Sequence, residues 1–401
     1  MNRTIFFLIV IGTILLSGCW NKRELTDIAV VSALAIDKNE EGKYVGTFQV
    51  INAGNIASGE QGGGGENAPI RVFSATGESL IQMSRNAAAK MPRQLFYEHV
   101  KLLVISEELA KNEGINTIFD SLDRSPNFRI TTRVVLARDT EAANVVKVLT
   151  AIEKLPSEGI IKTLKSAETM QGETVTVDIH AIMNALRSPG KEPVISAFTL
   201  KGDEKSGERI QSIQSTTLDA NLQAKGIGVF KEGKLIDWLE DDAASGTVWA
   251  LNKIQRTVMT LDWENEIDAV ALEVIRQNTG VTIEMISGKP KISIEIRAEG
   301  DIREVKNQLD LSHPNILMNI EKKLGKKLKT EIEDAILRAQ ENKSDIFGFG
   351  EMVYQDYPEE WKKIKADWQD VHFPELKVDV KTDIFVRQTG LRNKPYFSDF
   401  E

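Results

Sequence analysis

Lys291-Ile-Ser-Ile-Glu-Ile-Arg-Ala298 alternates apolar and polar side chains, which is the period of a half-buried β-strand. Residues 281–286 form a second apolar run across a turn containing Gly288, so the two runs are expected to pair as a hairpin. Downstream, Pro314 suits the first turn of a helix, and apolar residues then recur every four positions as far as residue 342. The recurring residues are Ile316, Ile320, Leu324, Leu328, Ile332 and Ile336. With a further strand at 376–386, the C-terminal part is predicted to be an α+β domain, a largely antiparallel sheet with helices against one face.

The rest of the chain is predicted to alternate strands and helices. Expected strands are 24–37, 44–52, 99–105, 129–137 and 194–201, and expected helices are 74–89, 107–112, 115–124, 141–149, 160–170, 177–186 and 358–368. A hairpin at 226–239 is expected to open the C-terminal domain. We therefore predict a multidomain α+β protein with an N-terminal α/β domain at 19–153, a small middle domain at 154–222 and a C-terminal α+β domain at 223–401.

The N-terminus has the pattern of an export signal. Arg3 precedes an apolar run from Ile5 to Leu16, which is shorter than the ~20 residues that a membrane-spanning helix needs. The run ends in Leu16-Ser-Gly-Cys19, and Cys19 is the only cysteine in the chain. We predict a signal peptide at 1–18, cleavage before Cys19 and attachment of diacylglycerol to its sulfur. The alternative is an ordinary signal peptide followed by an incidental cysteine.

The composition argues against two classes of binding function, nucleic-acid binding and phosphate binding by a glycine-rich loop. With 50 basic and 59 acidic residues the net charge is −9, which argues against a nucleic-acid-binding protein. Four consecutive glycines, Gly62 to Gly65, predict a flexible loop, since no Gly-Lys-Ser/Thr follows them to form a phosphate-binding loop.

No constellation of catalytic or metal-binding residues is found. The histidines His99, His180, His313 and His372 are widely spaced, so no zinc set is predicted, and His99 is interpreted as a hydrogen-bonded structural residue. The sequence has no Gly-x-Ser-x-Gly nucleophile turn. Asp241 and Asp242 are interpreted as solvated residues of a loop after the hairpin. We predict no enzyme activity, no catalytic residue, no metal and no cofactor.

Two C-terminal segments allow both a structural and a functional interpretation. Asp345-Ile-Phe-Gly-Phe-Gly350 has the form of a ligand-binding turn, but we favour a helix exit in which the glycines relieve strain and the phenylalanines fill the core. Trp361 and Trp368 are likewise expected in the core rather than at an interface.

A lysine cluster is the one basic feature of the long helix. Lys322, Lys323, Lys326 and Lys327 lie on its polar side, where such a run is most often a solvated face. The sharper hypothesis is contact with lipid headgroups or with an acidic partner, at ~1 kcal/mol for each lysine near an anionic surface.

Several segments, in this order, resemble the C subunits of the nutrient germinant receptors of endospore-forming bacteria. They are Gly18-Cys-Trp-Asn-Lys-Arg-Glu-Leu25, Phe96-Tyr-Glu-His99, Leu103-Val-Ile-Ser-Glu-Glu-Leu-Ala110, Gly226-Ile-Gly-Val-Phe-Lys231, Asp345-Ile-Phe-Gly-Phe-Gly350, Tyr357-Pro-Glu-Glu-Trp361 and Trp368. The glycine loop near Gly62 is longer than expected for that family. The resemblance implies three consecutive mixed α/β-type domains, no catalysis, and a lipoprotein on the outer face of the spore inner membrane beside polytopic A and transporter-like B subunits.

We therefore expect a membrane-tethered assembly and signalling subunit for nutrient-triggered germination. The alternative from another class is a solute-binding lipoprotein of a transporter, which would have two doubly wound lobes around a ligand cleft. The hairpins of the C-terminal third argue against such paired parallel sheets. A third class, a cell-surface hydrolase, lacks a nucleophile or a metal set.

Overall fold

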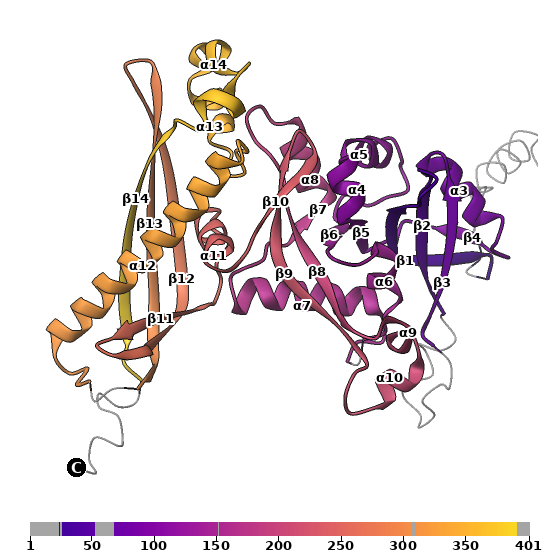
Figure 1. The fold of residues 1–401 in the computed structure, drawn as a ribbon, viewed down its shortest axis with the longest axis horizontal. Helices are drawn as coiled ribbons and strands as arrows, with labels where there is room; N and C mark the ends of the chain where they lie inside the picture. Colours follow the sequence, from indigo (N-terminus) through magenta and orange to yellow (C-terminus); the bar gives the residue numbers. More distant parts are fainter. Residues whose placement is uncertain (1–23, 25, 53–67, 151, 307–308, 391–401) are drawn as a thin grey trace, which may run out of the picture.

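The computed structural model describes residues 24, 26–52, 68–150, 152–306 and 309–390, and Figure 1 shows them as an elongated molecule built on two β-sheets. Cys19, the signal segment and the four-glycine run lie outside the described residues.

The larger sheet has ten strands in the order β10-β9-β8-β6-β5-β1-β2-β3, with β4 beside β1 and β7 beside β6. The strands are β1 (Ile28–Lys38), β2 (Tyr44–Ile51), β3 (Ile70–Gly77), β4 (Gln94–Phe96), β5 (Leu102–Ser106), β6 (Arg133–Ala137), β7 (Val177–Asp178), β8 (Val194–Gly202), β9 (Ala220–Lys231) and β10 (Lys234–Leu239). Its centre, β1, β5, β6 and β8, is parallel. Antiparallel strands close both ends, β2 and β3 at one and β9 and β10 at the other.

Helices cover both faces of this sheet, which explains why its central strands are apolar at consecutive positions. Leu103 and Ile105 of β5 face the core that contains residues of α4, α5 and α8, whereas Leu102 and Val104 face a second core under α6 and α7. The helices of this part are α3 (Leu80–Ala88), α4 (Glu107–Asn112), α5 (Asn116–Asp123), α6 (Ala142–Lys147), α7 (Pro156–Met170), α8 (Ile179–Arg187), α9 (Glu204–Gly207) and α10 (Ile210–Gln214).

The smaller sheet has the order β11-β12-β13-β14, with β11 (Val258–Trp263), β12 (Glu266–Ile286), β13 (Lys289–Val305) and β14 (Lys377–Gln388). The first two ladders are antiparallel and the last is parallel. The long helix α12 (Pro314–Glu341) crosses this sheet (Figure 1), and its residues at four-residue spacing, from Ile320 to Ile336, are buried. The remaining helices are α11 (Asp241–Ala250), α13 (Phe349–Asp356), α14 (Pro358–Ile364) and a π-helical turn, η1 (Trp368–His372).

Helix α12 contacts both outer strands of the smaller sheet. The Glu321 carboxylate accepts the Val386 N–H of β14 at 2.8 Å, and the Lys327 ammonium donates to the Thr260 carbonyl of β11 at 3.0 Å. One helix therefore satisfies a backbone group on each outer strand, which limits pairing with foreign strands at those positions.

The predicted α+β class, with a largely antiparallel C-terminal sheet and a long helix, is confirmed. Some element predictions were wrong. The helix expected from residue 74 begins only at Leu80, because the Ser79 side chain caps it and residues 70–77 pair with β2. The helix expected at 358–368 ends at Ile364 and is followed by η1.

The domain boundaries at 153/154 and 222/223 stay predictions. Strand pairing joins the segments on either side of both positions, however. Strand β8 pairs with β6 across the first boundary and with β9 across the second. The hairpin at 226–239, which is expected to open the C-terminal domain, forms β9 and β10 of the larger sheet. Its backbone is bonded to β8, a pairing that local turn signals do not reveal.

Candidate functional site

The four lysines of α12 divide into two pairs with different surroundings, although all four are exposed. The Lys323 ammonium lies 4.2 Å from the ring centroid of Trp263, and Lys327 is bonded to Thr260 as described above. The side chains of Lys322 and Lys326 form no hydrogen bond or ion pair with any residue that the structure describes. The four lysines are therefore not equivalent. Lys323 and Lys327 contact β11, whereas Lys322 and Lys326 face solvent.

Lys322 and Lys326 continue an outward line that begins at Met318, because residues four apart share one face of a helix. Met318 is 64% exposed. The nearby acid Glu321 is bonded to the backbone of β14, and Glu331 points toward Ser245 of α11, whose hydroxyl donates to it at 3.1 Å. We call Met318, Lys322 and Lys326 the lysine stripe.

A second candidate region surrounds the buried carboxylate of Asp345, just beyond α12. Its Oδ1 accepts the N–H groups of Gly348 at 2.8 Å and Phe349 at 3.1 Å, and its Oδ2 accepts the Gly350 N–H at 2.7 Å and the Trp368 indole N–H at 3.0 Å. Burial raises the pKa of Asp345 to about 6, while these donors oppose the shift by favouring the charged form.

The two glycines of this turn, Gly348 and Gly350, have different structural roles. Gly348 has a φ of +77°, the left-handed conformation that favours glycine, and it precedes α13. A Cβ on Gly350 would lie 2.6 Å from the Trp368 indole nitrogen, so Gly350 permits close packing rather than relieving strain. Phe349 is fully buried and Phe347 is partly buried against the core, as predicted. Trp361 and Trp368 are buried as well, which confirms their place in the core.

The segment around Asp345 also joins the two sheets. The Glu192 N–H donates to the Asp345 carbonyl at 2.9 Å, and the Glu192 carboxylate accepts the Glu232 N–H at 3.0 Å. The Ser344 hydroxyl donates to the Phe230 carbonyl at 2.5 Å. Burial raises the pKa of Glu192 to about 7.

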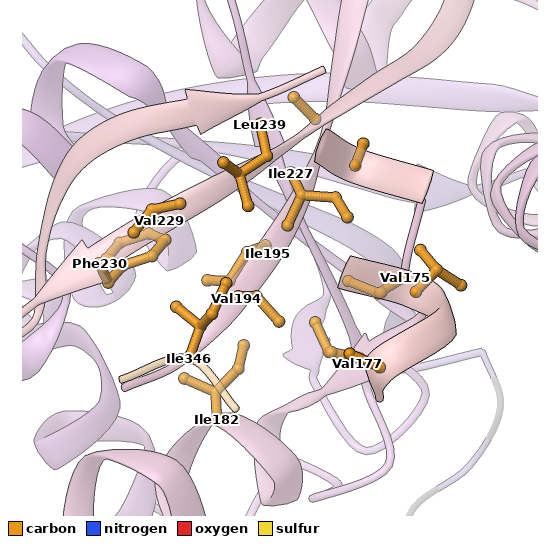
Figure 2. Close-up of a cluster of buried hydrophobic side chains, with 14 of the residues drawn as sticks. Val175, Val177, Ile182, Val194, Ile195, Ile227, Val229, Phe230, Leu239 and Ile346 are labelled. Atoms are coloured by element: carbon orange, nitrogen blue, oxygen red, sulfur yellow. The ribbon is translucent and has the colours of Figure 1, made fainter. Parts of the chain in front are cut away.

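Apolar packing accompanies these polar links. Figure 2 shows Ile346 among Ile182, Val194, Val229 and Phe230, all of which belong to the larger sheet or to α8. Lys231 and Asp370 form an ion pair at 2.7 Å at the edge of the contact. We call this contact, made by residues 342–350 with residues 188–195 and 230–238, the Asp345 junction. It fixes the C-terminal end of α12 to the larger sheet.

Sequence reasoning treated the turn after α12 as structural but did not single out Asp345, Glu192 or Glu331. The signal for Asp345 was its place two residues before Phe-Gly-Phe-Gly, since an acidic side chain there can accept the N–H groups of the following turn. Glu192 and Glu331 carry no such signal. Their burial follows from packing between elements far apart in the sequence.

The remaining sequence candidates are dispersed. His99 is exposed beside the Phe96 ring at 5.4 Å between centroids, and its side chain forms no hydrogen bond with the described residues. The other three histidines contact neighbours on their own segments: Asn184 for His180, Asp310 for His313 and Asp367 for His372. Asp241 and Asp242 are exposed, but they form the first turn of α11 and not a loop.

Within residues 24–390, leaving aside the gaps given above, no three His, Cys, Asp or Glu side chains gather in a way that suits a metal ion. Among the helices of the same described part, none combines the length and apolarity needed to cross a membrane. Cys19 lies outside the described residues.

Comparisons with known proteins cover nearly the whole chain. Residues 21–200 match the family described as "Spore germination protein N-terminal domain", and residues 225–390 match "Spore germination B3/ GerAC like, C-terminal". "Spore germination protein KC" of Bacillus subtilis (strain 168) is 42% identical over 396 residues, covering 98% of this chain and 97% of that protein. "Spore germination protein GerQC" of Bacillus cereus is 22% identical, covering 98% and 99%.

A solved structure shares the fold. The crystal structure of the GerBC protein aligns with a TM-score of 0.56 at 19% identity, covering 88% of this chain and 96% of that one.

Proposed function

We propose that this chain is the lipid-anchored subunit of a nutrient germinant receptor. It belongs to the GerAC family of spore germination proteins and is a C subunit of that non-catalytic family. Acyl chains on Cys19 would hold it on the outer face of the spore inner membrane. There it would assemble with polytopic A and B subunits and pass on the signal that follows nutrient binding. The observation that carries this proposal is the 42% identity to the KC protein over 98% of the chain.

The lipid anchor is supported by the sequence Leu16-Ser-Gly-Cys19 after a short apolar run. Two acyl chains give stable attachment where one is marginal, because each buried methylene contributes ~0.8 kcal/mol. Confinement to a membrane layer then raises the effective concentration of the subunit toward its partners.

Replacing Cys19 tests the anchor. We expect Cys19→Ala to abolish incorporation of a labelled fatty acid and to release the protein from spore membranes, whereas Ser17→Ala keeps a small residue at the cleavage site and serves as control. Germination on individual nutrients is measured in parallel, with a strain that lacks the whole gene. A labelled Cys19→Ala protein, or normal germination of the gene-deletion strain on every nutrient, would contradict the proposal.

The lysine stripe is proposed as a docking surface for lipid headgroups or an acidic segment of a partner. Its support is geometric: the side chains of Lys322 and Lys326 are exposed on α12 without a partner among the described residues, whereas those of Lys323 and Lys327 contact β11. Each free lysine near an anionic surface is worth ~1 kcal/mol.

The two lysine pairs supply matched variants of equal charge. We expect Lys322→Gln with Lys326→Gln to weaken vesicle binding or copurification of the A and B subunits by about tenfold or more. Lys323→Gln with Lys327→Gln should leave both unchanged while lowering thermal stability. Loss of vesicle binding would identify lipid, and loss of copurification alone would identify a partner. Equal effects of the two double variants would argue against a role for the stripe.

Nutrient recognition is assigned to a partner subunit. Calorimetric titration of the purified protein with amino acids and sugars tests this assignment. Tight binding of a nutrient would instead favour the solute-binding alternative.

A further inference from the structure

A polar cavity of about 600 Å³ opens at the carboxyl ends of β1, β5 and β6. Its walls include Lys38 at the end of β1, Ser106 at the end of β5 and Asp139 just after β6. These three strands are parallel neighbours in the larger sheet. The cavity is therefore separate from the lysine stripe, which lies on α12.

The connections that follow β5 and β6 leave the sheet on opposite faces. Strand β5 leads into α4, whose Leu109 packs in the same core as Leu103. Strand β6 leads into α6, whose Val145 packs in the other core with Leu102. A crevice forms where the connections of adjacent parallel strands diverge in this way, and small molecules bind preferentially at such a point. Residues of both connections line the cavity.

The positive charges on the walls are engaged within the chain. Each of the three lysines has a carboxylate partner: Lys38 with Glu113, Lys111 with Glu107 at 2.5 Å, and Lys147 with Glu208 at 3.6 Å. An anionic ligand would have to displace these partners, so the cavity does not favour an anion.

The negative charges on the walls are only partly balanced. Against the three lysines stand five acids, namely Asp37, Glu107, Glu108, Asp139 and Glu141. Glu108 and Glu141 are exposed, and their side chains form no hydrogen bond or ion pair with the described residues. The charges that are left over for a ligand are therefore carboxylates, which favour a cation.

Asp37 is the buried acid of the cavity, with 8% of its surface exposed. Its Oδ1 accepts the Ala142 N–H at 2.7 Å and its Oδ2 accepts the Ala143 N–H at 2.9 Å, but it forms no ion pair with a described residue. Burial raises the pKa of Asp37 to about 6, although these two donors favour the charged form. Buried carboxylates are normally paired with a cation, so a ligand ammonium would supply the countercharge that the described chain does not.

The rest of the lining distinguishes between kinds of cation. Within the described residues no three acidic side chains gather as a metal ion requires. None of the described residues that line the cavity is aromatic, whereas quaternary ammonium groups are recognised by aromatic rings. A primary ammonium has three N–H donors and stays charged at neutral pH, so it can bond to several carboxylate and hydroxyl oxygens at once.

We propose that this cavity binds a small organic diamine, with one ammonium at Asp37 and the other at the exposed rim, where Glu108 and Glu141 lie. An amino acid suits the cavity less well, because its carboxylate would meet the same acids. The inference goes beyond the proposed function and does not depend on it, since none of the groups that it uses belongs to the anchor or to the lysine stripe.

Three matched compounds test the ligand class by calorimetric titration of the full chain in neutral detergent. 1,4-Diaminobutane carries two ammonium groups, ornithine adds a carboxylate to the same skeleton, and 1,4-butanediol has hydroxyls in place of both amines. We expect diaminobutane to bind as a single molecule per chain, ornithine to bind at least about tenfold more weakly, and the diol not to bind. Equal binding of ornithine or of the diol, or no binding of diaminobutane at millimolar concentration, would overturn the inference.

Charge-matched variants test the location. Glu108→Gln with Glu141→Gln is expected to weaken diaminobutane binding about fivefold, and Asp37→Asn to abolish it. Glu98→Gln with Glu284→Gln changes the net charge equally at exposed acids that do not line the cavity, and it should leave the affinity unchanged. Equal affinities of the two double variants would overturn the location. Because Asp37→Asn also removes an acceptor of a backbone N–H group, circular dichroism checks its fold, and a folded Asp37→Asn protein that still binds would overturn the role of Asp37.

Discussion

The indole N–H of Trp368 donates a 3.0 Å hydrogen bond to Oδ2 of Asp345, and both side chains are buried at the end of α12. The same carboxylate binds three successive backbone N–H groups of the turn that leads into α13. One acidic side chain therefore fixes the direction of the chain after α12, and its backbone carbonyl ties that turn to Glu192 beside the larger sheet. The contact between the two sheets depends on this carboxylate being intact.

Asp345→Ala is expected to destabilise the fold by at least about 3 kcal/mol, because it leaves several buried donors without an acceptor. Denaturant unfolding followed by tryptophan fluorescence measures the loss. Asp356→Ala, at an exposed position on α13, is the control and should stay within about 0.5 kcal/mol of the parent protein. A loss as small as that of the control would mean that water replaces the carboxylate.

Gly246→Ala is expected to separate α11 from α12. A Cβ at this position would lie 2.2 Å from the Glu331 carbonyl oxygen, so one helix must move, at a cost of about 1–3 kcal/mol or more. Gly280→Ala in β12 is the matched control, since the nearest heavy atom to its Cβ would be 4.0 Å away. Thermal unfolding of the two variants makes the comparison, and equal midpoints would show that the crossing accommodates a methyl group.

Glu331→Gln is expected to remove part of the pH dependence of stability. Burial beside Asp242 raises the pKa of Glu331 from 4.5 to about 7, so the native state prefers the protonated form. The stability that this preference provides is complete below about pH 4.5 and is lost as the pH rises through 7. Glutamine, which stays neutral, should match the parent protein at pH 4 and exceed it at pH 8 by up to about 3 kcal/mol.

Urea unfolding at the two pH values measures this difference. Glu333→Gln, at an exposed position on the same helix, is the control and should change little at either pH. A Glu331→Gln protein that is less stable than its parent at pH 8 would mean that the charged form is favoured in the fold.

Lys323→Gln is expected to cost about 0.5–1 kcal/mol through loss of the cation–π contact with Trp263, whereas Lys322→Gln should cost almost nothing. Because the two lysines are adjacent and both exposed, the pair isolates the contact from helix propensity and net charge. Differential scanning calorimetry at low and high salt makes the measurement. The same loss in both variants would remove the structural distinction on which the lysine stripe rests.

Helical periodicity was sufficient to find α12. It was expected at 314–342 and observed at Pro314–Glu341, because a helix forms its hydrogen bonds between residues four apart and shows its buried face as a local period. The burial of Trp361 and Trp368 followed from the same kind of reasoning.

Strand pairing was harder to predict. For β12, only 281–286 was expected, but the strand runs from Glu266 to Ile286. Its earlier residues include Glu273, Arg276 and Asn278, which do not alternate cleanly, and their strand conformation depends on pairing with β11 and β13. Strands bond to partners that the local sequence does not specify. For the same reason the hairpin of β9 and β10 was predicted, but its pairing with β8 in the larger sheet was not.

Residue order alone thus determined the family resemblance, the α+β class and the long helix, because these depend on motifs and on periods within one segment. Tertiary structure alone decided which lysines of that helix have partners among the described residues and which carboxylates are buried. Lys327 is held by Thr260, and Asp345 accepts a bond from Trp368, through contacts between elements that only the folded chain brings within hydrogen-bonding distance. The partners of a side chain come from elements that are distant in the sequence. The sequence therefore does not distinguish the four lysines, which the fold divides into two pairs.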